Sequence, residues 1–256
     1  MPFRPFRSRR NRTENSAAPA GMRIYAIGDV HGRLDLLTAL LHLIEQDNRM
    51  LPSADRRVVM LGDLIDRGPE SAGVINLLLN HRPDFARFHF LIGNHEEAMI
   101  QSLEDGADPH QVEWLRYGGR ETLRSYGVPE EAFEMRGSLM SDELRRYVPQ
   151  SHIGFVRSFE ETLVLGDYLF VHAGIRPGKP LARQIRKDFL WIREPFLHDK
   201  TTDHGYIVVH GHTIERKPVF APNRIGIDTG AYATGVLTAL VLEGTERRIL
   251  QASDAA

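Results

Sequence analysis

The first hundred residues alternate between short apolar runs and amphipathic stretches. The apolar runs span 23–27, 58–61 and 88–92. Each has the length of a strand, and each ends at a glycine that is followed by an acidic or amide residue. After each run, polar and apolar residues recur at helical spacing, which predicts helices that begin near Leu34, Ser71 and Glu96. Three strand-loop-helix units in a row predict an α/β fold with helices packed on a sheet.

The pattern changes in the middle of the chain and again in the last third. Residues 104–157 are polar and helical in pattern, and are broken by Gly118, Gly119 and several prolines. We expect this segment to be a helical cap inserted into the fold. From Thr162 onward short apolar runs return, including one that reads as a hairpin turning at Gly166 and Asp167. The predicted architecture is therefore α/β (α+β): two sheets packed face to face, with helices outside and a cap insertion.

Composition limits the remaining possibilities. The chain of 256 residues is 42% hydrophobic, which suits one core-forming domain, expected at 22–256. Residues 1–21 carry five arginines and one glutamate without periodicity, which predicts a disordered basic tail. The net charge of -2 gives no general attraction to nucleic acid or to an anionic membrane. The absence of cysteine excludes disulfides and thiolate ligands, and no apolar run approaches the roughly 20 residues of a membrane span, so a cytoplasmic protein is expected.

Polar side chains gather where the predicted strands end. They are Asp29, His31, Asp63, Asp66, Arg67, Asn94, His95, His172, His210 and His212. In α/β sheets ligands bind beyond the carboxyl ends of strands, so residues far apart in the sequence can converge in one crevice. Several carboxylates in one crevice would repel one another unless cations were present. Oxygen and nitrogen ligands without thiolate suit Mn²⁺, Fe²⁺ or Zn²⁺.

The motifs that contain these residues are similar to those of a known family. G-D-V-H-G (28–32), G-D-L-I-D-R-G (62–68) and G-N-H-E (93–96) closely resemble the signature of the phosphoprotein phosphatase family of calcineurin-like metallophosphoesterases. Four further segments resemble its bacterial and phage lambda-like branch: V-H-A-G (171–174), W-I-R-E (191–194), H-G-H-T (210–213) and I-D-T-G-A (227–231). The resemblance spans about 22–243, and it implies a sandwich of two mixed sheets.

The resemblance implies a centre of two divalent metal ions, Mn²⁺ first, with Fe²⁺, Zn²⁺, Ni²⁺ or Co²⁺ as alternatives. Asp29 and His31 would bind the first ion, and Asp63 would bridge both. The implied ligands that complete the second are Asn94, His172 and His212. His210 is expected to lie outside the ligand set, and Ile214 stands where nuclease-like relatives carry a further histidine ligand.

It also implies direct attack on phosphorus by a hydroxide that bridges the metals, with His95 as the general acid. Asp66 would hold the other ring nitrogen of His95. The expected phosphate-binding residues are Arg67, Asn94, His95 and Arg193, because arginine offers planar paired donors to phosphate. Arg183 and Arg186 remain alternatives to Arg193.

The predicted function is that of a serine/threonine protein phosphatase. A symmetrical dinucleoside tetraphosphatase, or another nucleotide or RNA-end pyrophosphohydrolase, is the alternative. We expect such tetraphosphatases to resemble the chain less, and to differ at the Asp66 position. The expected partner is a phosphoprotein or a small phosphorylated substrate, without specific nucleic-acid binding or membrane binding, and the sequence does not predict a regulatory subunit. A non-catalytic metal-binding scaffold would lack a ligand or the acid, and neither is missing here.

Overall fold

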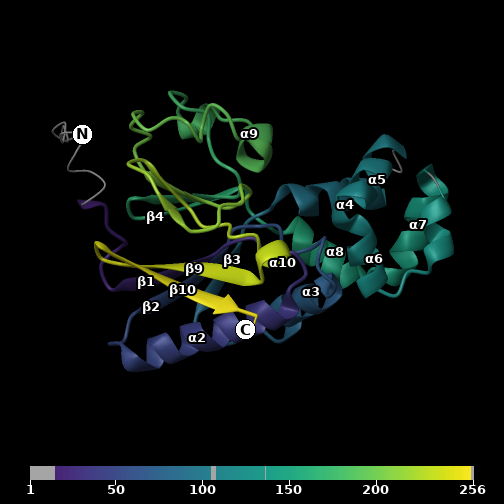
Figure 1. Cartoon of the computed structure of the whole chain (residues 1–256), viewed down its shortest axis with the longest axis horizontal. Helices are drawn as coiled ribbons and strands as arrows, with labels where there is room; N and C mark the ends of the chain where they lie inside the picture. Colours follow the sequence, from purple (N-terminus) through teal and green to yellow (C-terminus); the bar gives the residue numbers. More distant parts are fainter. Residues whose placement is uncertain (1–14, 105–107, 136, 255–256) are drawn as a thin grey trace.

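The computed structural model describes residues 15–104, 108–135 and 137–254, and it contains two five-stranded sheets that face each other (Figure 1). The first sheet has the order β10-β9-β1-β2-β3 and the second has the order β4-β5-β6-β8-β7. The strands of the first sheet are β1 (Met22–Ile27), β2 (Asp55–Met60), β3 (Arg87–Phe90), β9 (Val236–Glu243) and β10 (Glu246–Ser253). Those of the second are β4 (Thr162–Leu165), β5 (Tyr168–Val171), β6 (Ile207–His210), β7 (Val219–Phe220) and β8 (Arg224–Gly226). Each sheet contains parallel and antiparallel pairs, which confirms the predicted sandwich of mixed sheets.

Alternation along β1 explains how one strand contributes to two cores. Ile24 and Ala26 pack with apolar residues of the second sheet, in the layer between the sheets. Tyr25 and Ile27 point the other way and join the core under the helices. Successive side chains of a strand point to opposite faces, so a short run that is apolar throughout fits a strand buried on both sides.

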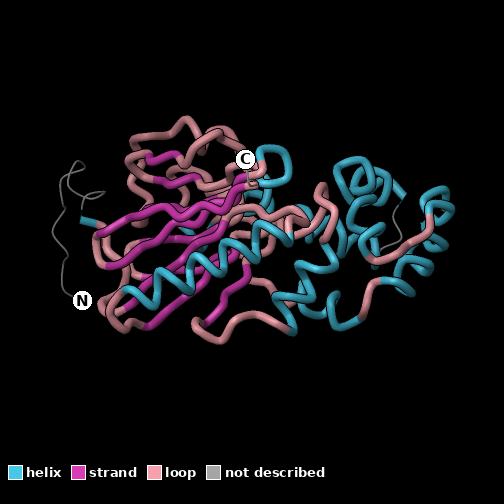
Figure 2. The backbone as a smooth tube through the Cα atoms, turned by 60° about the horizontal axis from the view of Figure 1, so that its bottom comes forward, coloured by secondary structure: helices cyan, strands magenta, loops and turns pink. Residues whose placement is uncertain are grey.

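Helices cover the first sheet and lead away from its strand ends. Helix α2 (Leu34–Met50) packs across β9 and β10, as its long cyan coil shows in Figure 2. Helix α3 (Ser71–Asn80) follows β2, and helix α4 (Asn94–Glu104) follows β3. All three predicted helices are present, although α4 begins two residues before the expected Glu96. Because β1, β2 and β3 run parallel, the loops after them lie at the same edge of the sheet.

Helices also fill most of the segment predicted to be a cap, at one end of the sandwich (Figure 1). They are α5 (Asp108–Trp114), a π-helical turn (Leu115–Gly119), α6 (Arg120–Ser125), a 3₁₀ turn (Glu130–Glu134), α7 (Gly137–Tyr147) and α8 (Gln150–Arg157). The break expected at the two glycines lies in the π-helical turn, where Gly118 has a φ of +118°. Short helices also lie after β5 and β8: a 3₁₀ turn (Leu181–Arg183), α9 (Arg186–Trp191) and α10 (Ala231–Thr234).

The predicted disordered tail needs a correction at its carboxyl end. Residues 1–14 lie outside the described residues, but residues 16–18 are packed against the sandwich. The backbone N–H of Ala17 donates to the carboxylate of Asp167, and that of Ala18 donates to the carbonyl of Gly244. These contacts extend the folded unit toward the amino terminus, because small residues here fit between two hairpin turns. Among the described helices, none has the length and apolar character needed to cross a membrane.

Candidate active site

The loops at the strand ends hold five residues in a backbone conformation that side chains disfavour. Among the described residues, the non-glycine residues with positive φ are His31, Asp63, Asp66, Arg67 and His212. All five were predicted to belong to the site from the sequence. A left-handed conformation costs a non-glycine residue of the order of 1–3 kcal/mol, and such residues cluster at functional sites. The strain turns these side chains out of the strand direction and into one crevice.

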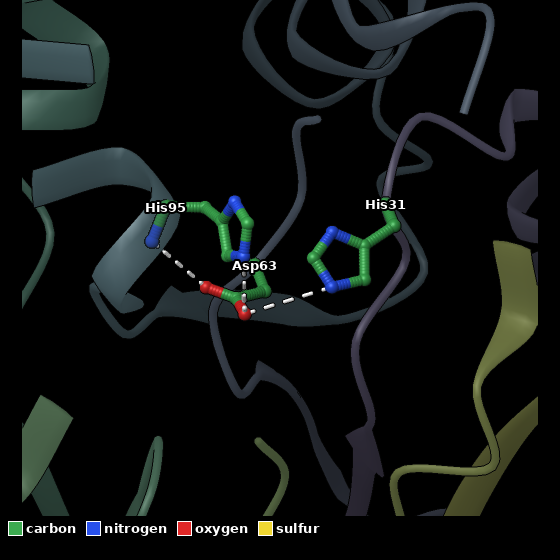
Figure 3. Close-up of side chains that lie close together, drawn as sticks. All are labelled: His31, Asp63 and His95. Carbon is green, nitrogen blue, oxygen red and sulfur yellow. Dashed lines mark hydrogen bonds and ion pairs between the residues drawn. The ribbon is translucent and has the colours of Figure 1, made fainter. Parts of the chain in front are cut away.

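The structure brings the expected metal ligands together around Asp63. One group joins His31, Asp63 and His95, and a second joins Asp63, His172 and His212; the ligand atoms within each group lie within 4.8 Å of one another. In the first group, Asp63 Oδ2 lies 3.6 Å from His31 Nε2 and 3.9 Å from His95 Nε2 (Figure 3). In the second, Asp63 Oδ1 lies 3.4 Å from His172 Nε2. One carboxylate thus faces both groups, as expected of a bridging ligand.

Backbone carbonyls fix the orientation of two of these histidines. His31 Nδ1 lies 2.8 Å from the carbonyl of Ile65, and His172 Nδ1 lies 2.9 Å from the carbonyl of Leu61. Each Nδ1 carries the donated proton, so each Nε2 presents its lone pair toward Asp63. A ligating histidine usually donates its other ring N–H in this way.

The charge states of the histidines also suit metal binding. Burial lowers the pKa of His31 to about 3, that of His212 to about 2, and also that of His172. These side chains are therefore neutral near pH 7, which is the form that binds a metal. Burial alone would raise the pKa of Asp63, but the surrounding histidines outweigh it and lower that pKa.

Asn94 and Asp29 lie beside the two groups. Asn94 Oδ1 is 2.9 Å from His172 Nε2, at the first turn of α4. The carboxylate of Asp29 accepts the backbone N–H of His212 at 3.0 Å, so it lies between the first loop and the loop after β6. A Cβ at residue 211 would lie 2.1 Å from Asp29 Oδ1, which explains why Gly211 is needed there.

A second carboxylate, Asp228, approaches Asp29, and no role was predicted for it. It follows β8, is 3% exposed, and its Oδ1 accepts the backbone N–H of Gly230 at 2.8 Å. Burial raises the pKa of Asp228 to about 6, and burial together with Asp228 and Asp63 also raises the pKa of Asp29. Its signal in the sequence was the strand-end motif I-D-T-G-A. A third carboxylate beside the site increases the need for cations.

Glu96 is a further functional residue that the sequence reasoning left without a role. Its side chain is fully buried, and Oε2 accepts the backbone N–H of both Asp63 and Gly93 at 2.9 Å. Oε1 accepts the backbone N–H of Leu64 at 2.7 Å. Glu96 thereby holds the loop that carries Asp63 against the start of α4. Burial, with the nearby charge of Asp63, raises the pKa of Glu96 to about 7.

His95 and Asp66 form the expected pair. His95 Nδ1 lies 2.6 Å from Asp66 Oδ2, and both side chains are buried. Burial alone would lower the pKa of His95, but the charges of Asp63 and Asp66 outweigh it and raise that pKa. The Nε2 atom faces Asp63 and the crevice (Figure 3). This histidine can therefore carry a proton into the site.

A pocket of about 580 Å³ opens over these residues. Asp63, Asn94, His95 and His212 line it, together with Arg67 and Arg193. The guanidinium of Arg193 lies 3.5 Å from the carbonyl of His212.

Other residues considered for the site lie elsewhere in the described structure. Arg186 pairs with Glu97 at 2.7 Å and with Glu161 at 2.6 Å, and neither Arg183 nor Arg186 lines the pocket. His210 is buried at the end of β6, where Nε2 lies 3.3 Å from Arg224 and away from both metal-binding groups.

Both groups have the features of metal sites. His212 Nε2 is buried and has no hydrogen-bond partner among the described residues. Leaving a buried polar atom without a partner costs free energy. His31 on one side of the ionised Asp63, and His172 and His212 on the other, are neutral imidazoles that offer ligand atoms for two ions. The residues present therefore fit a pair of divalent cations without thiolate ligands.

Comparison with known proteins agrees with this arrangement. Residues 22–232 match the calcineurin-like phosphoesterase family. The bis(5'-nucleosyl)-tetraphosphatase PrpE (asymmetrical) of Geobacillus thermodenitrificans is 27% identical over 86% of this chain and 90% of its own. Serine/threonine-protein phosphatase 1 of Salmonella typhimurium is 29% identical over 84% of this chain and 89% of its own. Relatives of both kinds are similar to the chain to nearly the same extent, so overall similarity does not separate the two functions.

A solved structure shares the fold. The crystal structure of a putative diadenosine tetraphosphatase superposes with a TM-score of 0.65 at 19% identity, and covers 93% of this chain and 97% of that one. The family match covers both groups around Asp63 and the His95 and Asp66 pair, so the protein is a metal-binding hydrolase. The chain belongs to the calcineurin-like phosphoesterase family.

Proposed function

We propose that this protein is a two-metal phosphomonoesterase that removes phosphate from phosphoserine and phosphothreonine in proteins, with Mn²⁺ as its metal. The observation that carries this proposal is the 2.6 Å contact between Asp66 and His95, which lines the pocket. A serine or threonine alkoxide is a poor leaving group and needs a proton as it departs. A nucleotide that leaves from a polyphosphate is already a stable anion, so it needs an acid less.

Two sets of side chains would hold the two metal ions. Asp29, His31 and Asp63 would hold one metal ion, and Asp63, Asn94, His172 and His212 would hold the other. When bound, two such ions would lower the pKa of a water molecule and neutralise charge on a phosphate. The carboxylates of Asp29, Asp63 and Asp228 lie together in the site, and their negative charge would favour binding of the ions.

The remaining residues bind the phosphate and move the proton. Arg67 and Arg193 approach the phosphate from the sides of the pocket and neutralise its oxygens. As the oxygen of a water molecule, which gives up one proton to solvent, bonds to phosphorus and the ester bond breaks, His95 Nε2 gives its proton to the departing oxygen. Asp66 keeps Nδ1–H in place and stabilises the charged ring until His95 takes up a proton again from water.

A second candidate function is hydrolysis of dinucleoside tetraphosphates, which aromatic side chains at the pocket favour. Tyr117, Trp191 and Tyr232 line it and are 56%, 44% and 37% exposed. Exposed aromatic rings are platforms on which nucleobases stack, at about 1–3 kcal/mol for each base. Tyr117 belongs to the cap and Trp191 to α9, so two nucleobases could stack on side chains from different walls of the pocket.

One comparison decides between these functions. The Mn²⁺-loaded protein is assayed on a phosphoserine peptide and on diadenosine tetraphosphate, and the Asp66→Asn variant is assayed beside it. We expect kcat/KM to be higher for the peptide, and we expect Asp66→Asn to lower kcat on the peptide by about 10² or more. Faster cleavage of the tetraphosphate, with little effect of Asp66→Asn, would instead assign the protein to the second function. Activity that persists after chelation would rule out both.

A further inference from the structure

Asp66 receives hydrogen bonds from the cap as well as from His95. The indole Nε1–H of Trp114 donates to Asp66 Oδ2 at 2.9 Å, the same oxygen that faces His95. The hydroxyl of Thr122 donates to Asp66 Oδ1 at 2.6 Å. All of these side chains are buried, with Asp66 and Thr122 fully so and Trp114 1% exposed. Two of the three donors to this carboxylate therefore come from the cap.

The backbone of the cap is fitted to the same loop. The N–H of Asp66 donates to Thr122 Oγ1 at 2.8 Å, and the N–H of Arg67 lies 3.3 Å from the carbonyl of Gly118. A Cβ on Gly118 would lie 2.6 Å from the nitrogen of Arg67, so only glycine permits this approach. The π-helical turn at 115–119 separates Trp114 from Thr122 and lets both reach Asp66.

These contacts bear on the orientation of the acid. A carboxylate with a single partner rotates freely about its last bond, because that rotation has a shallow energy profile. Donors on both oxygens fix its plane, and hydrogen bonds to a charged group are stronger than neutral ones. With its plane fixed, Asp66 Oδ2 stays opposite His95 Nδ1, and the ring keeps Nε2 aimed at the pocket.

We propose that Trp114 and Thr122 are positioning residues that act on the reaction through Asp66 and His95. The cap is then part of the proton-transfer machinery and does more than form one wall of the pocket. This inference rests on the proposed role of His95 as the acid. Removing a donor should slow only those reactions in which the leaving group needs a proton.

The test compares two substrates of similar shape, phenyl phosphate and p-nitrophenyl phosphate, whose leaving groups differ in their need for a proton. Thr122→Val should lower kcat on phenyl phosphate by about 10-fold, a part of the 10²–10⁴ contributed by general acids, and leave KM unchanged. The rate on p-nitrophenyl phosphate should change by less than about 2-fold, because little proton donation is needed there. Trp114→Phe, which keeps the ring and removes the donor, should act in the same direction, and Thr122→Ser should restore the rate.

Ser141→Ala is the matched control, since it removes a buried cap hydroxyl that bonds to Ser102 and Gln111 and does not touch Asp66. It should leave both rates unchanged. Equal losses on both substrates in Thr122→Val, or the same pattern of loss in Ser141→Ala, would overturn the inference by showing that only cap stability had changed. Retained kcat on phenyl phosphate in both Thr122→Val and Trp114→Phe would overturn it as well.

A double-variant cycle separates this inference from the proposed function. If Thr122 acts through Asp66, Thr122→Val should add nothing to Asp66→Asn, so the two effects will not be additive. Additive effects would overturn the inference and leave the role of Asp66 intact. A rate on phenyl phosphate that Asp66→Asn leaves unchanged would contradict the proposed acid pair itself.

Discussion

Glu96 offers the sharpest test of how the loop that carries Asp63 is held. In Glu96→Gln one carboxylate oxygen becomes an NH₂ group that faces the backbone donors of Asp63 and Gly93, or that of Leu64. At least one buried N–H then loses its acceptor, at a cost of about 1–3 kcal/mol, and it faces the new NH₂ group donor to donor. We expect a total loss of about 3 kcal/mol in the free energy of unfolding.

The assay is urea unfolding of the metal-free protein at pH 5, below the raised pKa of about 7, so that Glu96 is neutral in the folded state and its ionisation does not oppose folding. With a slope of about 3 kcal/mol per molar urea, the midpoint should fall by about 1 M. Glu97→Gln is the matched control, because Glu97 makes a surface ion pair with Arg186, worth less than about 1 kcal/mol. Equal midpoints for the two variants would refute the view that Glu96 anchors the loop.

Four further predictions follow from the site and its surroundings. His95→Asn should lower kcat on a phosphoserine peptide by about 10²–10⁴ without loss of bound metal, as steady-state kinetics and elemental analysis would show. Asp63→Asn should bind fewer than two metal ions per chain, and two retained ions would count against its bridging position. Gly118→Ala should lower the free energy of unfolding by about 2 kcal/mol, because φ is +118° and the new Cβ meets the backbone of Arg67; an unchanged urea midpoint would contradict this. Burial lowers the pKa of His210 to about 3, against about 6.5 in the unfolded chain, so its contribution to stability is present above pH 6.5 and is lost as the pH falls. The destabilisation caused by His210→Gln should therefore shrink by about 1 kcal/mol for each unit that the pH falls from 6 to 4. A difference in unfolding free energy from wild type that does not vary with pH would exclude this origin.

Much of the framework was predictable, because each unit of the fold has a local signal. The strand-loop-helix pattern predicted the sandwich, and the polar residues at strand ends predicted the residues around Asp63. The loop φ values give a physical reason for that success: glycines next to the polar residues allow the sharp turns that aim them inward. The packing of residues 16–18 had no such signal, since their composition was that of the tail before them.

Roles that depend on the direction of a side chain could not be read from the sequence. Glu96 stands in the first turn of a helix, where an acidic residue commonly interacts with the helix dipole. The contact of its side chain with the loop that carries Asp63 is a tertiary contact, and such a contact produces no periodic pattern in the sequence. Trp114 and Thr122 likewise lie in a stretch with a polar, helical pattern, and their hydrogen bonds to Asp66 are visible only in the structure, where the cap lies beside that loop.

The strand order of the first sheet also affects how the chain is made. β1 lies between β2, which follows it closely, and β9, which begins at Val236. During synthesis from the amino terminus, β1 and β2 leave the ribosome long before β9 is translated. One edge of β1, with its unpaired backbone groups, stays uncovered throughout that interval, and an open edge is a template for pairing with another chain. The strand that begins the site is thus also the place where a half-made chain is most exposed to misassembly.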